Sequence, residues 1–552
     1  MRFRMKIAGM TCTDCEVRVD SALRGAGATA VVVEHRRGEA MFDAPSDVDV
    51  PRLAAAVQEA GYRPGPTDRL AHPPARNTPG QGRTRPGARG LYDLAIVGSG
   101  GAAFSAAIHA TEAGARVVMI ERATVGGTCV NVGCVPSKTL LRAGEIHHLA
   151  GHHLFAGLGT AAGVVDMKEL VAQKDGLVRE LRTRKYDDLI ADYGWELVRG
   201  EAQFTGPSAL AAADRRIEAR AFLVATGARP AVPNIAGLAE AGYLTSTTAL
   251  ELDRVPRSVA VIGSGYIALE LGQLLRRLGA RVTLMQRGSR LLPGYDPEVS
   301  ETMKGVLDAE GIDVLLGVRY DRVEGGVGAR RVHVEVRGRE QIIEVEDILV
   351  AAGRQPNTES LRLDRAGVRT GERGQVLIDA ELRTNVPSIL AAGDVTLGPQ
   401  FVYVAAYEGR VAAANALGAH QEMDLSVVPS VTFTSPAVAT VGLTEERARA
   451  AGYAVKTSTL PLDAVPRALV NHDVRGVFKL VADAKTDRLL GAHVVAENAG
   501  DVIYAATLAV KYHLTVADLA NTMAPYLTMA EGMRLASQTF DRDVDRLSCC
   551  AG

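Results

Sequence analysis

The chain has 552 residues, enough for three or four domains of about 150 residues each. Its 62 basic and 64 acidic residues give a formal net charge of −2, which excludes bulk electrostatic attraction to nucleic acid or an anionic membrane. The apolar run at the basic N-terminus is too short for a secretion signal, and three glycines interrupt the longest uncharged stretch, residues 94–111. We therefore expect a cytoplasmic protein that neither inserts into a membrane nor binds nucleic acid.

The six cysteines are unevenly distributed. A secreted scaffold would spread them to close long loops, whereas here hundreds of residues carry none. In a reducing compartment, paired thiols indicate redox chemistry or the binding of a soft metal ion. The cysteines form three close pairs: Cys12 with Cys15, Cys129 with Cys134, and Cys549 with Cys550.

Residues 1–63 predict a compact unit of the order β-α-β-β-α, with a further strand near Tyr62. This order favours a ferredoxin-like βαββαβ sandwich. Cys12 would end a loop and Cys15 would begin a helix, so that two thiolates converge on one soft ion. A thioredoxin-like CxxC motif is the alternative, which the preceding strand and the missing cis-proline pattern disfavour.

Residues 64–90 have a different composition. Six prolines, five glycines and five arginines occupy these 27 positions, together with a single acid, Asp68. Such a segment cannot bury a core, so we predict a flexible linker.

From residue 91 onward the chain repeats a pattern of strand, glycine turn and helix. The pattern occurs at residues 94–97 followed by Gly98, and again at residues 259–262 followed by Gly263. It predicts an α/β protein with two Rossmann-like domains and hence two bound nucleotides. The expected domains are a first nucleotide-binding domain at 91–240 that continues at 357–423, a second at 241–356, and an α+β domain at 424–552.

The first glycine motif opens a helix directly after a strand. Its residues Gly98, Gly100, Gly101 and Ala103 would let the backbone approach a pyrophosphate at the helix N-terminus. Glu121 ends the next predicted strand, where a ribose hydroxyl needs an acceptor. The alternative is an ordinary tight turn between a strand and a helix.

The second glycine motif contains Gly263, Gly265 and Ala268. The strand after it ends in Gln286 rather than an acid, and Arg287 and Arg290 follow. An acid there would repel a 2′-phosphate, whereas arginines would bind it, so NADPH is favoured over NADH. Alternatively, both arginines are solvated surface residues.

Residues 126–138 read GGTCVNVGCVPSK and contain the second cysteine pair. Gly133 permits the bend that a small disulfide between Cys129 and Cys134 requires, and a helix beginning near Pro136 would stabilise a thiolate through its dipole. A zinc site would need two more ligands, and none is close in sequence. Structural cysteines are the other alternative.

This motif, with Ala-Thr-Gly at 225–227, AAGRQPN at 351–357 and AAGD at 391–394, resembles the flavin-dependent pyridine nucleotide-disulfide oxidoreductases. The resemblance covers residues 91–552, and within the family it is to the branch that reduces mercuric ion. It implies an FAD, with Cys134 as the thiolate against the flavin and Cys129 as the exchange thiol. It also implies that Lys138 pairs with Glu270 near flavin N5, and that the FAD contacts include Thr128, Ala202, Val402 and Asp394.

Two departures from the disulfide-reducing members decide the expected substrate. Those enzymes carry a histidine five residues before Glu531, and here Tyr526 stands in its place. A phenol with a pKa near 10 is a poor proton shuttle, which disfavours dihydrolipoamide or glutathione as substrate. Adjacent cysteines form only a strained disulfide, so Cys549 and Cys550 favour a soft-metal clamp over an incidental tail.

Residues 9–15, GMTCTDC, resemble the heavy-metal-associated domain of metal chaperones. The resulting hypothesis is that Hg(II) passes from Cys12 and Cys15 to the tail cysteines, and then to Cys129 and Cys134. There it would gain two electrons that originate from NADPH and would leave as Hg(0).

The family resemblance implies a homodimer with shared active sites. In it, Cys549, Cys550 and Tyr526 would face the partner subunit's Cys129. Tyr186 matches a tyrosine of the family that lines the metal position, although it could instead be a packed, half-buried tyrosine. The competing functions are a dihydrolipoamide-type oxidoreductase with an accessory metal domain, and a metallochaperone or metal store.

Overall fold

The computed structural model describes residues 2–10, 13–34, 38–44, 50–69 and 91–542. The chain divides into two compact units, Met1–Arg85 and Pro86–Gly552. Among the described residues, no helix has the length and apolar character needed to cross a bilayer.

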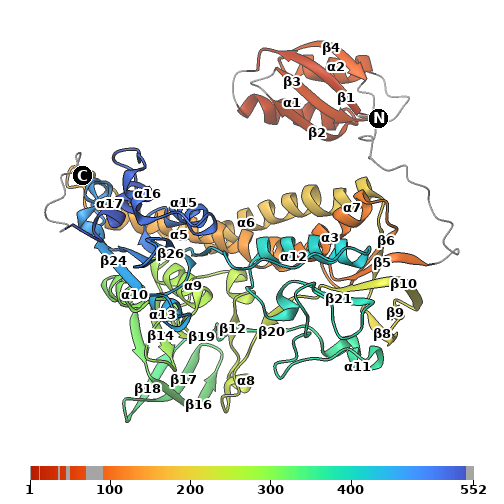
Figure 1. The fold of residues 1–552 in the computed structure, drawn as a ribbon. Helices are drawn as coiled ribbons and strands as arrows, with labels where there is room; N and C mark the ends of the chain where they lie inside the picture. Colours follow the sequence, from red (N-terminus) through yellow and green to blue (C-terminus); the bar gives the residue numbers. More distant parts are fainter. Residues whose placement is uncertain (1, 11–12, 35–37, 45–49, 70–90, 543–552) are drawn as a thin grey trace. The chain divides into compact units, whose positions relative to one another are not determined.

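The first unit is the predicted ferredoxin-like sandwich (Figure 1). Its antiparallel sheet has the order β2-β3-β1-β4, and both helices contact it. The core includes Met5, Leu23 and Phe42, none of which is exposed to solvent. The elements are β1 (Arg2–Ala8), α1 (Thr13–Gly25), β2 (Thr29–Glu34), β3 (Glu39–Asp43), α2 (Val50–Glu59) and β4 (Arg63–Arg69).

The last strand of this unit extends into the segment that composition assigns to the linker. Strand β4 pairs with β1 from Ala8↔Arg63 to Phe3↔Arg69. Proline cannot donate to a ladder, but β4 is an edge strand, so Pro64 and Pro66 are tolerated there. The predicted boundary at residue 64 is therefore too early by about six residues.

The second unit begins with a Rossmann-like domain. Four parallel strands follow in the order β7-β6-β5-β10, and β21, from much later in the chain, pairs in parallel with β10. Helices α3 and α12 pack closely, since a Cβ on Gly409 would lie 2.1 Å from the carbonyl oxygen of Ala102. The elements are β5 (Tyr92–Val97), α3 (Gly101–Glu112), β6 (Val117–Glu121), β7 (Glu196–Arg199), β8 (Gln203–Gly206), β9 (Ala209–Ala212), β10 (Arg215–Val224), α11 (Leu363–Ala366), β21 (Ile389–Ala391) and α12 (Val402–Ala416).

A helical segment lies between β6 and β7 and carries the central cysteine pair. It comprises α4 (Gly127–Asn131), α5 (Cys134–His152), α6 (Met167–Arg182), a π-helical turn η1 (Thr183–Asp187) and α7 (Asp188–Tyr193).

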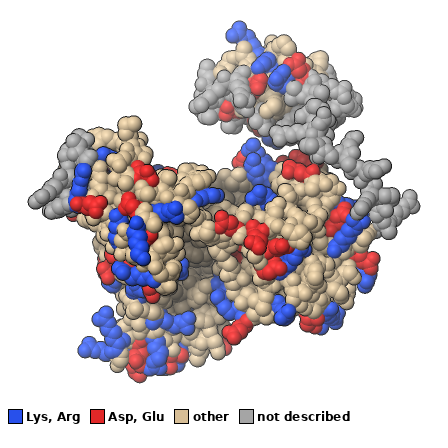
Figure 2. Space-filling view, viewed as in Figure 1, with Lys and Arg blue, Asp and Glu red and all other residues tan. Residues whose placement is uncertain are grey.

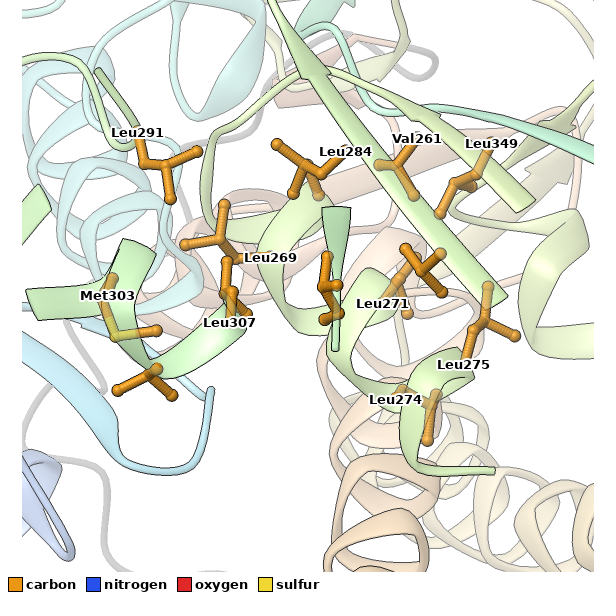
Figure 3. Packing of buried hydrophobic residues seen from close by; sticks show 14 of the residues in the cluster. Val261, Leu269, Leu271, Leu274, Leu275, Leu284, Leu291, Met303, Leu307 and Leu349 are labelled. Carbon is orange, nitrogen blue, oxygen red and sulfur yellow. The ribbon is translucent and has the colours of Figure 1, made fainter. Parts of the chain in front are cut away.

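The second Rossmann-like domain has the parallel strand order β12-β19-β13-β14-β15. Leucines of α9 pack with Val261 and Leu284 of the sheet in a buried core (Figure 3). The elements are α8 (Leu238–Ala241), β12 (Leu244–Thr245), β13 (Ser258–Ile262), α9 (Tyr266–Arg277), β14 (Arg281–Gln286), α10 (Pro297–Ala309), β15 (Asp313–Leu316), β16 (Val318–Gly326), β17 (Ala329–Val336), β18 (Arg339–Val345) and β19 (Asp347–Val350). Strands β11 (Ala228–Pro230) and β20 (Arg354–Pro356) pair where the two Rossmann-like domains join.

The third part is the expected α+β domain. Its antiparallel sheet has the order β22-β23-β26-β25-β24, and α15 packs on β23 and β26. The elements are β22 (Ser430–Thr432), β23 (Ala437–Gly442), α13 (Glu445–Ala450), β24 (Val455–Pro461), α14 (Pro466–Asn471), β25 (Val477–Asp483), β26 (Leu489–Ala496), α15 (Ala499–Lys511), α16 (Val516–Asn521) and α17 (Glu531–Gln538).

Basic and acidic side chains are interspersed over the face of the second unit shown in Figure 2. Many of them pair, as Arg229 does with Glu359 at 2.5 Å. Charge is therefore balanced locally as well as in total, and recognition of a ligand depends on particular side chains rather than on a broad field.

A buried lysine ties the second Rossmann-like domain to the third domain. The side chain of Lys479 in β25 is 1% exposed, and its ammonium lies 2.7 Å from Glu298, 2.9 Å from Glu445 and 3.6 Å from Asp296. Asp296 also lies 3.2 Å from the buried imidazole of His493. Removal of the lysine charge would leave the buried carboxylate of Asp296, and the partly exposed carboxylates of Glu298 and Glu445, without their cation.

We expect Lys479→Met to lower the free energy of unfolding by about 3–5 kcal/mol, because breaking a buried ion pair leaves an uncompensated charge. Thermal melting of the purified protein measures this loss. Lys485→Met, at an exposed position two residues after β25, is the matched control and should change stability by less than about 0.5 kcal/mol. Equal melting temperatures for the two variants would contradict the prediction.

Candidate functional site

The central cysteine pair lies at the starts of two successive helices. Cys129 is half-buried in α4, and Cys134 is the exposed first residue of α5. Gly133 allows the turn between them, since a Cβ there would lie 2.9 Å from the carbonyl oxygen of Thr128. The turn brings the two thiols within hydrogen-bond distance of each other.

The surroundings make the two thiols unequal in acidity. The hydrogen bond from Cys129 and the ammonium of Lys138 lower the pKa of Cys134 to about 7, although burial opposes them. The same hydrogen bond, together with burial, raises the pKa of Cys129. Cys134 therefore carries the thiolate near neutral pH, and Cys129 is the proton donor to it.

Lys138 owes its position to side chains and backbone from three domains. The predicted pair with Glu270 is present, with Nζ 2.7 Å from Oε2 of that almost fully buried carboxylate. The other oxygen of Glu270 accepts a hydrogen bond from the backbone N–H of Phe433 at 2.8 Å, and the ammonium lies 4.6 Å from the centroid of the Phe433 ring. Sequence reasoning missed Phe433, because it lies 163 residues beyond Glu270 and belongs to no motif.

A cavity of about 410 Å³ adjoins the cysteine pair. It brings together most of the residues predicted to bind FAD. The predicted residues that line it are Gly98, Gly100, Gly101, Glu121, Thr128, Cys129, Cys134, Lys138, Glu270, Asp394 and Val402. Ala202 lines a smaller neighbouring cavity that shares Gly98 and Glu121 with the large one.

The two alanines of the glycine motifs are the third residues of α3 and α9. Ala103 and Ala268 are both 0% exposed, so neither can contact a nucleotide. Their small side chains instead allow α3 and α9 to pack closely on their sheets, as the third position of this motif requires.

The residues that line the large cavity have the chemistry that FAD requires. Gly98 has φ +110°, and a Cβ there would lie 2.3 Å from the carbonyl oxygen of Ala225, so only glycine can form this cradle. Gly100 caps α3 without a side-chain hydrogen bond, which leaves backbone N–H groups for a pyrophosphate. Glu121 accepts a hydrogen bond from the Ser99 hydroxyl at 2.6 Å and lies where a ribose would bind.

Asp394 is the last residue of the AAGD motif, which begins at the end of β21, and it lines the large cavity. Burial raises its pKa, and the guanidinium of Arg354, 3.3 Å away, opposes this rise. Together with the N-terminus of α12 at Val402, it gives the cavity a polar end suited to the remainder of FAD.

The second glycine motif repeats the backbone geometry of the first. Gly263 has φ +124°, and a Cβ there would lie 2.3 Å from the carbonyl oxygen of Ala351. Gln286 ends β14 at the place that Glu121 occupies in the first domain, and Arg287 and Arg290 are exposed beyond it. Residues 286–290 thus contain two exposed arginines and no acid.

Tyr186 lies beside the cysteine pair but outside the large cavity. Its ring packs edge-on against Phe104, with the centroids 4.8 Å apart. Burial raises the pKa of its hydroxyl, and so do the charges of Cys129 and Cys134. Tyr186 is therefore both a half-buried packed tyrosine and a neighbour of the thiols.

Tyr526 and Glu531 lie away from this cavity in the described part of the chain. Tyr526 is 50% exposed in the loop after α16. Glu531 is buried at the start of α17, and its Oε2 finds no hydrogen-bond partner among the described residues.

Only half of the predicted metal ligands can be placed. Cys12, Cys549 and Cys550 lie outside the described residues. Cys15 is half-buried near the start of α1 and packs on the core of the first unit with Met10. Residues 2–69 and 91–542, apart from the gaps given above, contain no group of three or more His, Cys, Asp or Glu that could hold a metal ion.

Comparison with known proteins agrees with this geometry. The model of the pyridine nucleotide-disulphide oxidoreductase family matches residues 92–409, and the model of its dimerisation domain matches residues 428–537. The chain belongs to this family. Members of the pyridine nucleotide-disulphide oxidoreductases use FAD together with NADH or NADPH.

Relatives match the chain over its full length. A mercuric reductase of Staphylococcus aureus is 56% identical over 551 residues, which is 100% of this chain and 99% of that protein. A mercuric reductase of Shigella flexneri is 42% identical over 99% of this chain and all of that protein. One from Streptomyces lividans is 50% identical over 473 residues, or 84% of this chain and 98% of that protein.

Among solved structures, the HOCl-induced flavoprotein disulfide reductase RclA from Escherichia coli has a similar fold. It is 30% identical, with a TM-score of 0.72 over 81% of this chain and 99% of that one. Its Cu(II) complex gives a TM-score of 0.73 over the same shares.

The ion pair of Lys138 with Glu270, next to the thiols, leads to a testable prediction. We expect Lys138→Met to raise the pKa of Cys134 from about 7 by about one unit, because a nearby cation favours the thiolate. The thiolate of Cys134 is titrated by its ultraviolet absorbance as a function of pH. The absorbance of the same protein with Cys134→Ser is subtracted at each pH. Lys168→Met, at an exposed site in the first turn of α6, should leave the midpoint unchanged. An unchanged midpoint in Lys138→Met would show that its ammonium does not stabilise the thiolate.

Proposed function

We propose that this protein reduces Hg(II) to Hg(0) with electrons from NADPH, and that its FAD-binding cavity and its Cys129–Cys134 pair form the reaction centre. The observation that carries this proposal is the 56% identity to a mercuric reductase over the full length of the chain. The matched length includes the regions in which the three cysteine pairs lie. The dithiol beside a nucleotide cavity supplies the chemistry that the match requires.

FAD, when bound in the large cavity, supplies the two-electron connection between the nicotinamide nucleotide and the thiol pair. The chain's own residues hold the substrate. The Cys134 thiolate displaces one ligand of Hg(II), and Cys129, after giving up its proton, displaces a second. Two electrons then convert Hg(II) to Hg(0), which has little affinity for thiolates and leaves.

Lys138 keeps a thiolate available for this ligand exchange. Its ammonium stabilises the negative charge on Cys134, and Glu270 fixes the direction of that ammonium. Tyr186 lies beside the loop that carries the pair, outside the cavity. In this arrangement Cys129 and Cys134 offer a soft ion two sulfur ligands.

A dihydrolipoamide-type activity is the alternative, and Tyr526 argues against it. Reduction of a disulfide substrate yields two thiols and needs a proton donor, and a phenol serves poorly near neutral pH. Reduction of a metal ion produces no protonated product. A metal store alone is disfavoured by the nucleotide cavity, which storage does not use.

We infer that NADPH is preferred over NADH. Arg287 and Arg290 supply the cations that a 2′-phosphate needs, and Gln286 stands where an acid would repel it. The same position in the first domain is Glu121, which suits an unphosphorylated ribose.

We also infer that two chains share each active site. The third domain matches the family's dimerisation domain and exposes apolar side chains, among them Tyr504, Tyr512 and Met523, at 65%, 66% and 94%. Tyr526 belongs to the same exposed region. A partner that covers it would receive Tyr526 and the tail cysteines near its own thiol pair.

The first unit would deliver Hg(II) through Cys12 and Cys15, and the tail pair would pass it on to Cys129 and Cys134. Exchange between dithiols keeps the ion bound, because one thiolate attaches before another leaves. The Streptomyces lividans relative matches a stretch about as long as the second unit alone, which supports delivery rather than catalysis as the role of the first unit.

We expect the FAD-containing protein to release mercury vapour from Hg(II) in an NADPH-dependent manner, and Cys549→Ala with Cys550→Ala to lower this rate by about tenfold or more, since loss of a positioned ligand is a large effect. Cys12→Ala with Cys15→Ala is the matched control. It should retain most turnover with small Hg–thiol complexes.

Three outcomes would contradict this reading. Fast turnover with lipoamide in place of Hg(II) would favour the disulfide-reducing alternative. Full activity without Cys549 and Cys550 would show that these cysteines do not transfer Hg(II). Loss of all activity in the control would make the first unit part of catalysis.

We expect Arg287→Gln with Arg290→Gln to raise the KM for NADPH by about ten- to a hundredfold, because two charge-assisted hydrogen bonds are lost. The KM for NADH should change little. Steady-state assays with both nucleotides give the ratio, and an equal change for the two would show that these arginines do not read the 2′-phosphate. Arg281→Gln, at the exposed start of β14, is the control.

A further inference from the structure

Four of the chain's 12 histidines lie within seven residues at the C-terminal end of α5, namely His147, His148, His152 and His153. Two of the four rings use both of their nitrogens within the protein. The ring nitrogens of His147 contact backbone carbonyl oxygens at 2.8 Å and 2.9 Å. Those of His153 contact the Thr160 hydroxyl at 2.7 Å and the backbone N–H of Phe155 at 3.3 Å. These two rings therefore hold the loop that follows α5.

His148 and His152 form the other pair. Their rings lie one helical turn apart and stack, with the centroids 4.4 Å apart and an angle of 9° between the planes. The Nδ1 atom of His152 lies 3.0 Å from the carbonyl oxygen of His148, which can only accept a hydrogen bond, so Nδ1 carries a proton. In the neutral ring the lone pair is therefore on Nε2, which has no hydrogen-bond partner among the described residues. The ring nitrogens of His148 have none there either.

The surroundings of His148 keep its ring neutral. The ring is half-buried, and burial lowers its pKa to about 4, with a further contribution from the charge of Arg277. Arg277 itself lies 2.7 Å from Glu310, and Arg475 lies 2.8 Å from Asp473. A cation bound at the ring would thus have a balanced group of two arginines and two carboxylates beside it. Because the imidazole is already neutral at pH 7, it has no proton to release before it binds a metal ion.

Two imidazoles four residues apart on one helix face are a known pattern of metal ligands. Each ligand nitrogen lies about 2.0–2.1 Å from a zinc ion, so two nitrogens on one ion are at most about 4.2 Å apart. The stacked centroids are 4.4 Å apart, and a rotation of the rings would bring one nitrogen of each onto a common ion. The described residues provide no third His, Cys, Asp or Glu to complete a set, but His152 is exposed, so water can occupy the remaining positions.

We propose that His148 and His152 form a metal site separate from the thiols, which binds a divalent ion of intermediate softness such as Zn(II), Cu(II) or Ni(II). Imidazole nitrogen suits these ions, whereas thiolates select softer ions and carboxylates harder ones. His148 follows Cys134 by fourteen residues in the same helix, which is about 21 Å along the helix axis. The inference does not depend on the proposed reduction of Hg(II).

Chemical modification of individual histidines tests the proposal. Diethylpyrocarbonate acylates neutral imidazole, and mass spectrometry gives the rate at each histidine of the full-length, FAD-containing protein. NiCl2 is the probe, because Ni(II) suits imidazole better than thiolate. At ten times its dissociation constant it leaves about one site in eleven free, and should slow the modification of His148 and His152 by about tenfold. The exposed His513 should keep its rate. MgCl2 should protect none of them, since Mg(II) takes oxygen ligands.

Binding of one ion by both rings predicts that each histidine depends on the other. His152→Asn should raise the Ni(II) concentration that protects His148 by about tenfold or more, since even loss of an outer-shell partner weakens a metal site by that amount. His148→Asn should have the same effect on His152. His153→Asn is the matched control, because it removes a neighbouring imidazole whose nitrogens are already used, and it should leave the protection unchanged. An unchanged melting temperature establishes that each variant is folded.

Two results would overturn the proposal. Protection of His148 at the original Ni(II) concentration in His152→Asn would show that the two rings do not share an ion. Modification of both histidines at the original rate in millimolar NiCl2 would show that no ion binds. Neither Hg(II) nor NADPH enters this assay, so a failure to release mercury vapour would contradict the proposed function and leave this result standing.

Discussion

The ammonium of Lys138 lies where all three domains of the second unit meet. Its helix belongs to the first Rossmann-like domain, its carboxylate partner Glu270 to the second, and the ring and backbone of Phe433 to the third. The acidity of Cys134 depends on this one charge and on the hydrogen bond from Cys129. Any relative movement of the domains would therefore change the pKa of Cys134. The buried contacts between the domains thus affect the chemistry of the thiol.

A steric constraint fixes the two nucleotide sites in the same manner. In each, the first glycine of the motif lies so close to a neighbouring strand that a Cβ would meet a carbonyl oxygen at 2.3 Å. The chain must turn at this point, and the turn aims the helix N-terminus at the ligand. The sites then differ in one side chain at the end of the next strand, Glu121 or Gln286, and this difference separates the two nucleotides expected there.

Local motifs were predictable from sequence, because their chemistry resides in neighbouring residues. The order of elements in the first unit, the glycine turn at Gly98 and the pair of Lys138 with Glu270 all followed from spacing or from family resemblance. Contacts between distant segments could not be predicted from sequence. Examples are the contact of Lys138 with the Phe433 ring and the hydrogen bond from Arg182 to Asn131. Strand β4 was mistaken for linker because composition reports the absence of a core, while an edge strand needs only backbone pairing.

The exchange of a histidine for Tyr526 is best understood through proton balance. Conversion of a disulfide to two thiols takes up two protons with its two electrons, so an enzyme for that reaction must keep an acid near the leaving sulfur. Conversion of Hg(II) to Hg(0) takes up electrons alone. The only protons involved are those released when thiols become ligands, and the low pKa of Cys134 already removes one of them. A phenol in place of the histidine is then no handicap, because no proton has to be delivered to a product. Glu531, five residues later, is buried with one oxygen unpaired among the described residues, so Tyr526 does not supply this carboxylate oxygen with the hydrogen bond that a histidine would donate.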